Sequence, residues 1–167
     1  PNFALFCQMT EQEQAEKTYH NILNLVWEFL TVKGAKINFE NQLEKLEEII
    51  PDVNDYDFFG VVPALDACEA LGELLHAIIA GETLEKAIQI SQISLGTVCS
   101  LLETQEDRDL SETELKSRKE IEEELDLQWQ IYRLLKDCEK RDVDLILSLR
   151  NEIKQEGISN IGIKIEQ

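Results

Sequence analysis

Apolar residues recur at i, i+3, i+4 and i+7 along most of the chain, the spacing that places them on one face of an α-helix. This period predicts amphipathic helices over residues 12–31, 39–50 and 119–156, preceded by a short helix that ends near Thr10. Each of these helices has one apolar stripe to bury. The pattern therefore predicts an all-α fold.

Two segments near the middle of the chain are more apolar than the rest. Between Pro63 and Gly81 the only polar positions of note are Asp66, Glu69, Glu73 and His76, and no charged residue lies between Ala87 and Leu102. Helices that are apolar nearly all round belong in the centre of a fold. We expect helices over 64–80 and 84–102, joined as an antiparallel hairpin. Leu75 and Ile88 are the core positions that we predict for them.

The C-terminal third carries two further predictions. No Gly or Pro interrupts residues 119–156, which favours one long helix, with a break around 140–142 as the alternative. In the segment 158–167 the period changes to two, because Ile161, Ile163 and Ile165 alternate with other residues, as in a strand. We expect an extended tail that packs on the domain's own helices, pairs with the tail of a second copy in a homodimer, or accepts a partner's strand.

Length and turn content fit a single all-helical domain over residues 1–167. The chain has only seven Gly and three Pro, too few for the turns of an all-β sandwich. The predicted fold is a compact bundle of about six to seven helices around the hairpin of 64–80 and 84–102. The chain begins at Pro1 rather than Met, and we expect that an N-terminal segment is missing.

The charge is strongly negative, with 34 acidic against 16 basic residues and a net charge of −18. Nucleic acids and anionic membranes repel such a chain, because they are bound through Lys and Arg. The negative charge does not disfavour a basic protein partner or a cation. The segment 46–85 has ten carboxylates, one histidine and no Lys or Arg, so its charge must be answered from elsewhere.

Four single cysteines, Cys7, Cys68, Cys99 and Cys138, occupy apolar positions and form no C-x-x-C motif. Free cysteines of this kind behave as small buried apolar residues and indicate a reducing cytoplasm. The longest uncharged run, from Ala87 to Leu102, is interrupted by Ser and Gln and is too short for a membrane span. We therefore expect a cytoplasmic protein.

Candidate chemistry is limited to a carboxylate and histidine pattern. Glu73 and His76 form an E-x-x-H motif, which places two metal ligands on one helical face. Asp66 and Glu69 continue the same stripe. Glu16 and His20, four residues apart on another helix, could supply a mononuclear site together with Glu73 and His76. The candidate metal ligands are Asp66, Glu69, Glu73, His76 and His20. A water-facing stripe of polar residues is the alternative interpretation.

Several short segments resemble the YjaG-like family of bacterial proteins, a family of unknown function. The matching segments are Trp27–Glu28, Leu30–Lys33, Asn38–Phe39, Gln42–Lys45, Gly60–Val61, Pro63–Ala64, Asp66–Cys68, Gly81–Leu84 and Ser159–Ile163. The resemblance covers nearly the whole chain. It implies a bacterial, all-helical, cytoplasmic protein and transfers no catalytic residue.

Two hypotheses on function follow. The chain has no nucleophile motif and no glycine-rich phosphate loop, so we expect a non-enzymatic protein without a cofactor that acts through protein–protein interaction on its acidic surface. The alternative is a metal-binding protein or metalloenzyme that holds a divalent metal on the stripe from Asp66 to His76.

Overall fold

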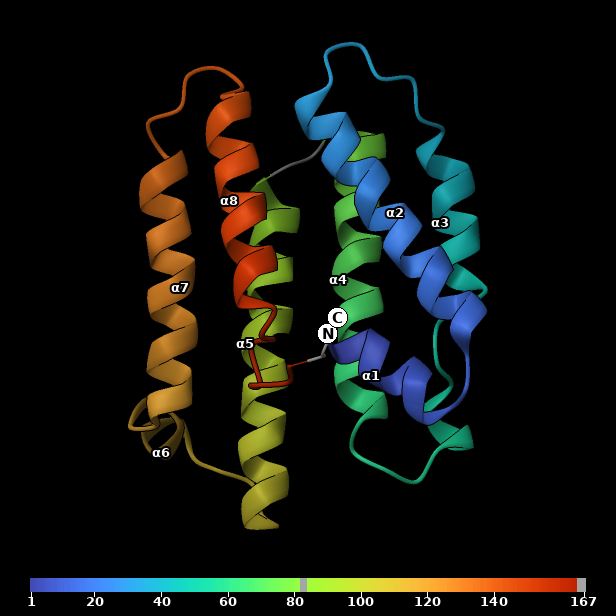
Figure 1. Cartoon of the computed structure of the whole chain (residues 1–167). Helices are drawn as coiled ribbons and strands as arrows, with labels where there is room; N and C mark the ends of the chain where they lie inside the picture. Colours follow the sequence, from blue (N-terminus) through green and yellow to red (C-terminus); the bar gives the residue numbers. More distant parts are fainter. Residues whose placement is uncertain (82–83, 165–167) are drawn as a thin grey trace.

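The computed structural model of the protein describes residues 1–81 and 84–164, and these form eight α-helices and one short 3₁₀ turn (Figure 1). The all-α prediction is confirmed. The elements are α1 (Asn2–Met9), α2 (Glu13–Thr31), α3 (Phe39–Glu47), η1 (Val53–Asp55), α4 (Val61–Ala80), α5 (Leu84–Glu106), α6 (Glu112–Lys116), α7 (Lys119–Leu135) and α8 (Val143–Glu156).

Helix α4 lies at the centre of the fold, because apolar residues occupy more than one of its faces. It packs against α1, α3 and η1 on one side and against α5 on the other. Leu75, Cys68 and Ala64 on α4 are fully buried, with Phe3 and Phe6 of α1 and Ile22 of α2 in the same cluster. Burial of this cluster, at about 25 cal/mol per Å² of apolar surface, is the main source of stability for this half of the fold.

Helix α5 connects the central helix to a second, smaller core. It packs on α4 and on α7, and its Val98 and Leu102 are buried with Leu110 and Ile121. The predicted hairpin of 64–80 and 84–102 is therefore confirmed. The core position at Ile88 is wrong, because that side chain is 51% exposed. Ile88 lies on a face of α5 that neither of these two neighbours covers.

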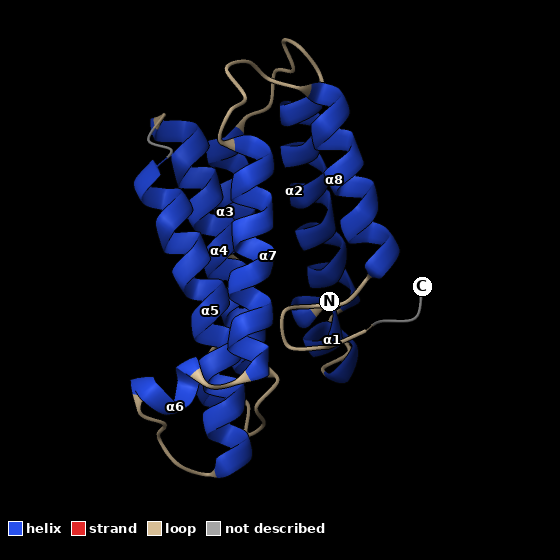
Figure 2. Cartoon of the chain, turned by 90° about the vertical axis from the view of Figure 1, so that its left-hand side faces the viewer, coloured by secondary structure: helices blue, strands red, loops and turns tan. Residues whose placement is uncertain are grey.

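Of the two alternatives for residues 119–156, the break applies, and it spans residues 136–142 rather than 140–142 alone. The bundle therefore has eight helices rather than six to seven. Helix α7 ends at Leu135 and α8 begins at Val143, where the Asp142 carboxylate accepts a hydrogen bond of 3.0 Å from the Leu145 amide. Helix α7 packs on α5, whereas α8 packs on α2. The chain must turn to reach both, and Figure 2 shows the two helices separated from one another.

The predicted extended tail over 158–167 is also wrong for residues 158–164, which form a tight turn. The Ser159 amide donates to the Ile163 carbonyl at 2.9 Å, and Ile158 bridges to Lys164. Gly162 permits this turn with a φ of +77°. Ile161 packs on the second core. Of the three alternatives for the tail, packing on the domain's own helices is therefore the one that applies. Ile165 lies outside the described residues.

Local sequence signals set several helix ends. The Asn38 side chain caps α3, Ser111 and Glu114 form a capping box at α6, and Gly81 ends α4 in the left-handed conformation. Hydrogen bonds from Arg108 and Ser111 lower the pKa of Glu114 to about 2. Within residues 1–81 and 84–164, no helix has both the length and the apolar character needed to cross a membrane.

Candidate acidic binding surface

The predicted polar stripe lies along α4 but faces different surroundings at each position. Glu69 and His76 are exposed to solvent. Glu73 forms an ion pair with Lys86 of α5, whose ammonium lies within hydrogen-bonding distance. The Glu69 and Glu73 side chains line a hollow of about 330 Å³ between α4 and α5, together with Gln89, Gln92 and Ile93. In the E-x-x-H pair, Glu73 is therefore engaged in an ion pair, and His76 faces solvent.

Asp66 is the stripe residue that faces inward. The Thr97 hydroxyl on α5 donates to its carboxylate at 2.7 Å. Burial raises the pKa of Asp66, and the hydrogen bond from Thr97 opposes that rise. This hydrogen bond joins α4 to α5 and therefore helps to hold together the hairpin that carries the stripe.

His20 does not join the stripe. It is exposed on α2, where its Nε2 lies 3.8 Å from the Glu16 carboxylate. Among residues 1–81 and 84–164, no group of three or more His, Cys, Asp or Glu side chains is placed so that it could hold a metal ion. The structure therefore does not bring Asp66, Glu69, Glu73, His76 and His20 together as a ligand set.

The acidic segment 46–85 keeps most of its carboxylates free of ion pairs within the fold. Among its described acidic residues, Glu73 is the one with a basic side chain within 4.0 Å. The others are Glu47, Glu48, Asp52, Asp55, Asp57, Asp66, Glu69 and Glu85. Apart from the pair between Lys86 and Glu73, the basic residues that the structure describes therefore do not neutralise this segment.

Asp52, Asp55 and Asp57 lie on the connection between α3 and α4, which runs beside the turn between α1 and α2 (Figure 1). The Gln12 side chain on that turn donates to the Tyr56 hydroxyl at 2.7 Å, and the Phe6 ring meets the Tyr56 ring edge-on at 4.9 Å. These contacts hold the turn and the connection together. We call the carboxylates of Glu11, Glu13, Asp52, Asp55 and Asp57, which surround this junction, the acidic end.

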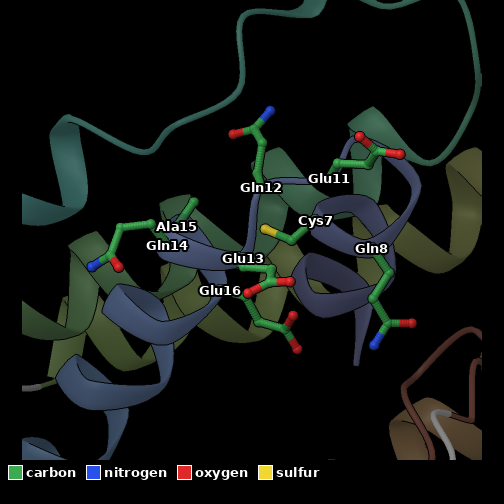
Figure 3. Close-up of a pocket in the computed structure, with 8 residues that line it drawn as sticks. All are labelled: Cys7, Gln8, Glu11, Gln12, Glu13, Gln14, Ala15 and Glu16. Atoms are coloured by element: carbon green, nitrogen blue, oxygen red, sulfur yellow. The ribbon is translucent and has the colours of Figure 1, made fainter.

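A hollow of about 790 Å³ opens at the acidic end (Figure 3). Glu11, Glu13 and Glu16 line it with Gln8, Gln12 and Gln14, and Glu11 has a φ of +57°. Cys7 also lines it, but burial raises the pKa of the Cys7 thiol to about 11, and the charge of Glu16 adds to this. The thiol is therefore protonated at neutral pH and is a poor nucleophile. The hollow offers oxygen acceptors and negative charge, which suit a cationic ligand.

Sequence comparison places the chain among known proteins. The family model described as a protein of unknown function (DUF416) matches residues 1–164. The chain belongs to the DUF416 family. The expected resemblance to YjaG-like proteins is thereby confirmed.

Three DUF416 relatives illustrate the family. A protein of Haemophilus influenzae is 72% identical to this chain, and proteins named YjaG from Salmonella typhimurium and Escherichia coli K12 are 52% and 51% identical. In each case the match covers 100% of this chain and 85% of the relative. The crystal structure of a DUF416 family protein from Shewanella baltica OS155 superposes with a TM-score of 0.88 at 32% identity, covering 99% of this chain and 86% of that one.

The acidic end includes Glu11 and Glu13, which no sequence pattern marks as candidate binding residues. The segment 46–85 was recognised by its lack of Lys and Arg, but Glu11 and Glu13 lie far from it in the sequence. They join it through the contact between Gln12 and Tyr56, which are 44 positions apart. No local sequence pattern predicts this contact. The sequence shows only that the turn contains two acidic residues, Glu11 and Glu13.

Proposed function

We propose that this DUF416 protein is a non-enzymatic binding protein whose acidic end holds a basic segment of a protein partner. The observation that carries the proposal is the scarcity of ion pairs in segment 46–85, where Glu73 is the one described acid with a basic neighbour. Carboxylates that are not neutralised within the fold produce a negative potential that attracts cationic partners and speeds their association.

The local geometry adds to this charge. Glu11, Asp55 and Asp57 are exposed, and none of the three takes part in an ion pair or a side-chain hydrogen bond within the described chain. They are therefore available to a ligand without breaking an existing contact. The hollow that Glu11 lines has room for extended Lys or Arg side chains, and its Gln side chains provide further acceptors.

A charge-matched comparison tests the proposal. One variant combines Glu11→Gln, Asp55→Asn and Asp57→Asn, and the control combines Asp144→Asn, Glu152→Gln and Glu156→Gln on α8. The two variants have the same net charge, so they differ only in which surface has lost its carboxylates. Binding of a fluorescent peptide of alternating Lys and Ala is measured by anisotropy at 0.15 M NaCl.

We expect the first variant to bind the peptide about tenfold more weakly than the control, because three carboxylates are removed from one contact surface. The affinity of the unmodified protein should fall steeply as salt is raised, and that of the first variant less steeply. Equal affinities for the two variants would show that the peptide senses net charge alone, and the acidic end would not be a binding surface.

A further inference from the structure

Helix α7 carries an exposed ridge of apolar side chains. Trp129 is 56% exposed, Tyr132 is 55% exposed and Leu125 is 45% exposed. Their spacing of 4 and 3 residues places them on one face of the helix. The Trp129 and Tyr132 rings stack with centroids 5.4 Å apart and form the aromatic part of the ridge. Large exposed apolar side chains gathered on one helical face are a common mark of an interaction site.

The neighbours of α7 leave this ridge uncovered within the described residues. The helix packs on α5 through the adjacent face, where Ile121 and Glu124 are buried and Gln128 exchanges hydrogen bonds with Ser91. Helix α6 touches the beginning of α7. Figure 2, with α7 at the front of the fold, shows how the helix is placed on the outside. A partner can therefore approach the ridge without displacing another helix.

Charged residues at the same helical spacing flank the ridge in a definite order. Glu122 and Asp126 come before Trp129, and Arg133 and Lys136 come after it. All four are exposed, and the spacing of 3 and 4 residues places them on the face that carries Trp129. Within the described chain, Glu122, Asp126 and Arg133 form no ion pair, and Lys136 only approaches its exposed neighbour Asp137 at 3.7 Å.

This order makes the ridge complementary to itself. If two copies of α7 cross antiparallel with Trp129 at the two-fold axis, Asp126 of one copy faces Arg133 of the other, and Glu122 faces Lys136. A two-fold axis produces each of these pairs twice. The apolar side chains of the two ridges then meet in the centre, with the charges at the rim.

We propose that a second copy of this chain covers the ridge, forming an antiparallel α7–α7 dimer with two-fold symmetry. The charges that flank the ridge favour this occupant over a basic protein, because a uniformly basic segment would meet Arg133 and Lys136 at one end of the ridge. An acidic segment would meet Glu122 and Asp126 at the other end. The surface is separate from the acidic end and goes beyond the proposed binding function.

The contact is small, so the dimer is weak. Stable dimers bury about 800 Å² on each partner, and one ridge with three half-exposed apolar side chains supplies less than this. We expect a dissociation constant of about 10 to 100 µM at 0.15 M NaCl. At this ionic strength the repulsion between two copies of net charge −18 is screened beyond about 8 Å, while the facing pairs remain closer than that.

Charge exchange tests the pairing. Sedimentation equilibrium is measured for the unmodified chain, for Asp126→Arg, for Arg133→Asp and for the variant with both changes. Each single change places like charges opposite one another and should raise the dissociation constant about tenfold. The double variant restores opposite charges across the axis and should return within about threefold of the unmodified chain. Trp129→Ala should weaken the dimer by about thirtyfold, as for a central aromatic anchor.

The control is Glu120→Arg, which makes the same charge change as Asp126→Arg on the opposite side of α7. It should leave the dissociation constant unchanged. Thermal melting by circular dichroism checks that each variant is folded, and the exposed positions make loss of folding unexpected. A chain that stays monomeric up to about 1 mM overturns the proposal. Single variants that dimerise like the unmodified chain, or a double variant weaker than either single one, overturn it as well.

Discussion

Asn2 and Asn160 lie 158 positions apart and are joined by a hydrogen bond of 3.1 Å from the Asn2 amide group to the Asn160 side-chain oxygen. The Asn160 amide group in turn donates to the Ser94 carbonyl at 2.9 Å and to the Ser94 hydroxyl at 3.0 Å. One side chain thus links the beginning of α1, the middle of α5 and the turn at 158–164. These hydrogen bonds hold the tail, in place of the strand pairing that the tail sequence predicts.

Replacement of Asn160 by Ala should therefore destabilise the whole fold rather than the tail alone. The change removes three hydrogen bonds and leaves the partly buried Ser94 carbonyl without this donor, which should lower the free energy of unfolding by about 1–3 kcal/mol. Urea denaturation measures the change. Asn151→Ala, an exposed position on α8, is the matched control and should stay within about 0.5 kcal/mol of the unmodified protein. Equal losses in the two variants would contradict a structural role for Asn160.

The two central helices differ in how well their apolar residues are covered. Leu75 on α4 has 0% exposure, whereas Ile88 on α5 is 51% exposed. Leu75→Ala should cost about 2–5 kcal/mol, because it removes buried methyl groups and leaves a cavity. Ile88→Ala should cost less than about 0.5 kcal/mol. Chemical denaturation of both variants is the measurement, and a larger loss at Ile88 than at Leu75 would place the core elsewhere.

The difference between these positions shows what periodicity can predict here. The spacing of apolar residues predicts the helices over 12–31, 39–50, 64–80 and 84–102 and the central hairpin, because that spacing depends on local chain geometry. It leaves open whether residues 119–156 form one helix or two. It did not identify which face of α5 would be covered, since this depends on where α7 packs. The break after Leu135 has the same cause, because α7 and α8 pack on different helices. For the acidic end, the sequence shows the unpaired acids of segment 46–85, but it does not show that Gln12 and Tyr56 bring them to the turn that carries Glu11 and Glu13.

Asp66 should make stability depend on pH in a defined direction. Burial raises its pKa above the ordinary value of 3.8, so the folded state favours the protonated carboxyl. The resulting stabilisation is complete below pH 3.8 and is lost as the pH rises through the pKa of the folded state. Asp66→Asn keeps an oxygen that can accept from the Thr97 hydroxyl and removes the charge. The variant should have a higher Tm than the unmodified protein at pH 7, and the gap should close toward pH 3.

The control for this titration is Asp57→Asn, which makes the same change of net charge at an exposed position. It separates the effect of burial from that of charge. If both variants raise the Tm equally at pH 7, relief of general repulsion explains the gain and the buried environment of Asp66 does not.

Salt should stabilise the protein, because its negative charge is only partly neutralised within the fold. The net charge is −18, and the described acids of segment 46–85 other than Glu73 have no basic neighbour. Raising NaCl from 0.01 to 0.15 M shortens the Debye length from about 30 to about 8 Å and screens the repulsion among these carboxylates. The Tm should rise over this range. The variant with Glu11→Gln, Asp55→Asn and Asp57→Asn should show a smaller rise than the charge-matched variant on α8, because its crowded carboxylates are already removed. A flat Tm for the unmodified protein would contradict repulsion at the acidic end, and equal rises in the two variants would show that the repulsion is spread over the whole surface.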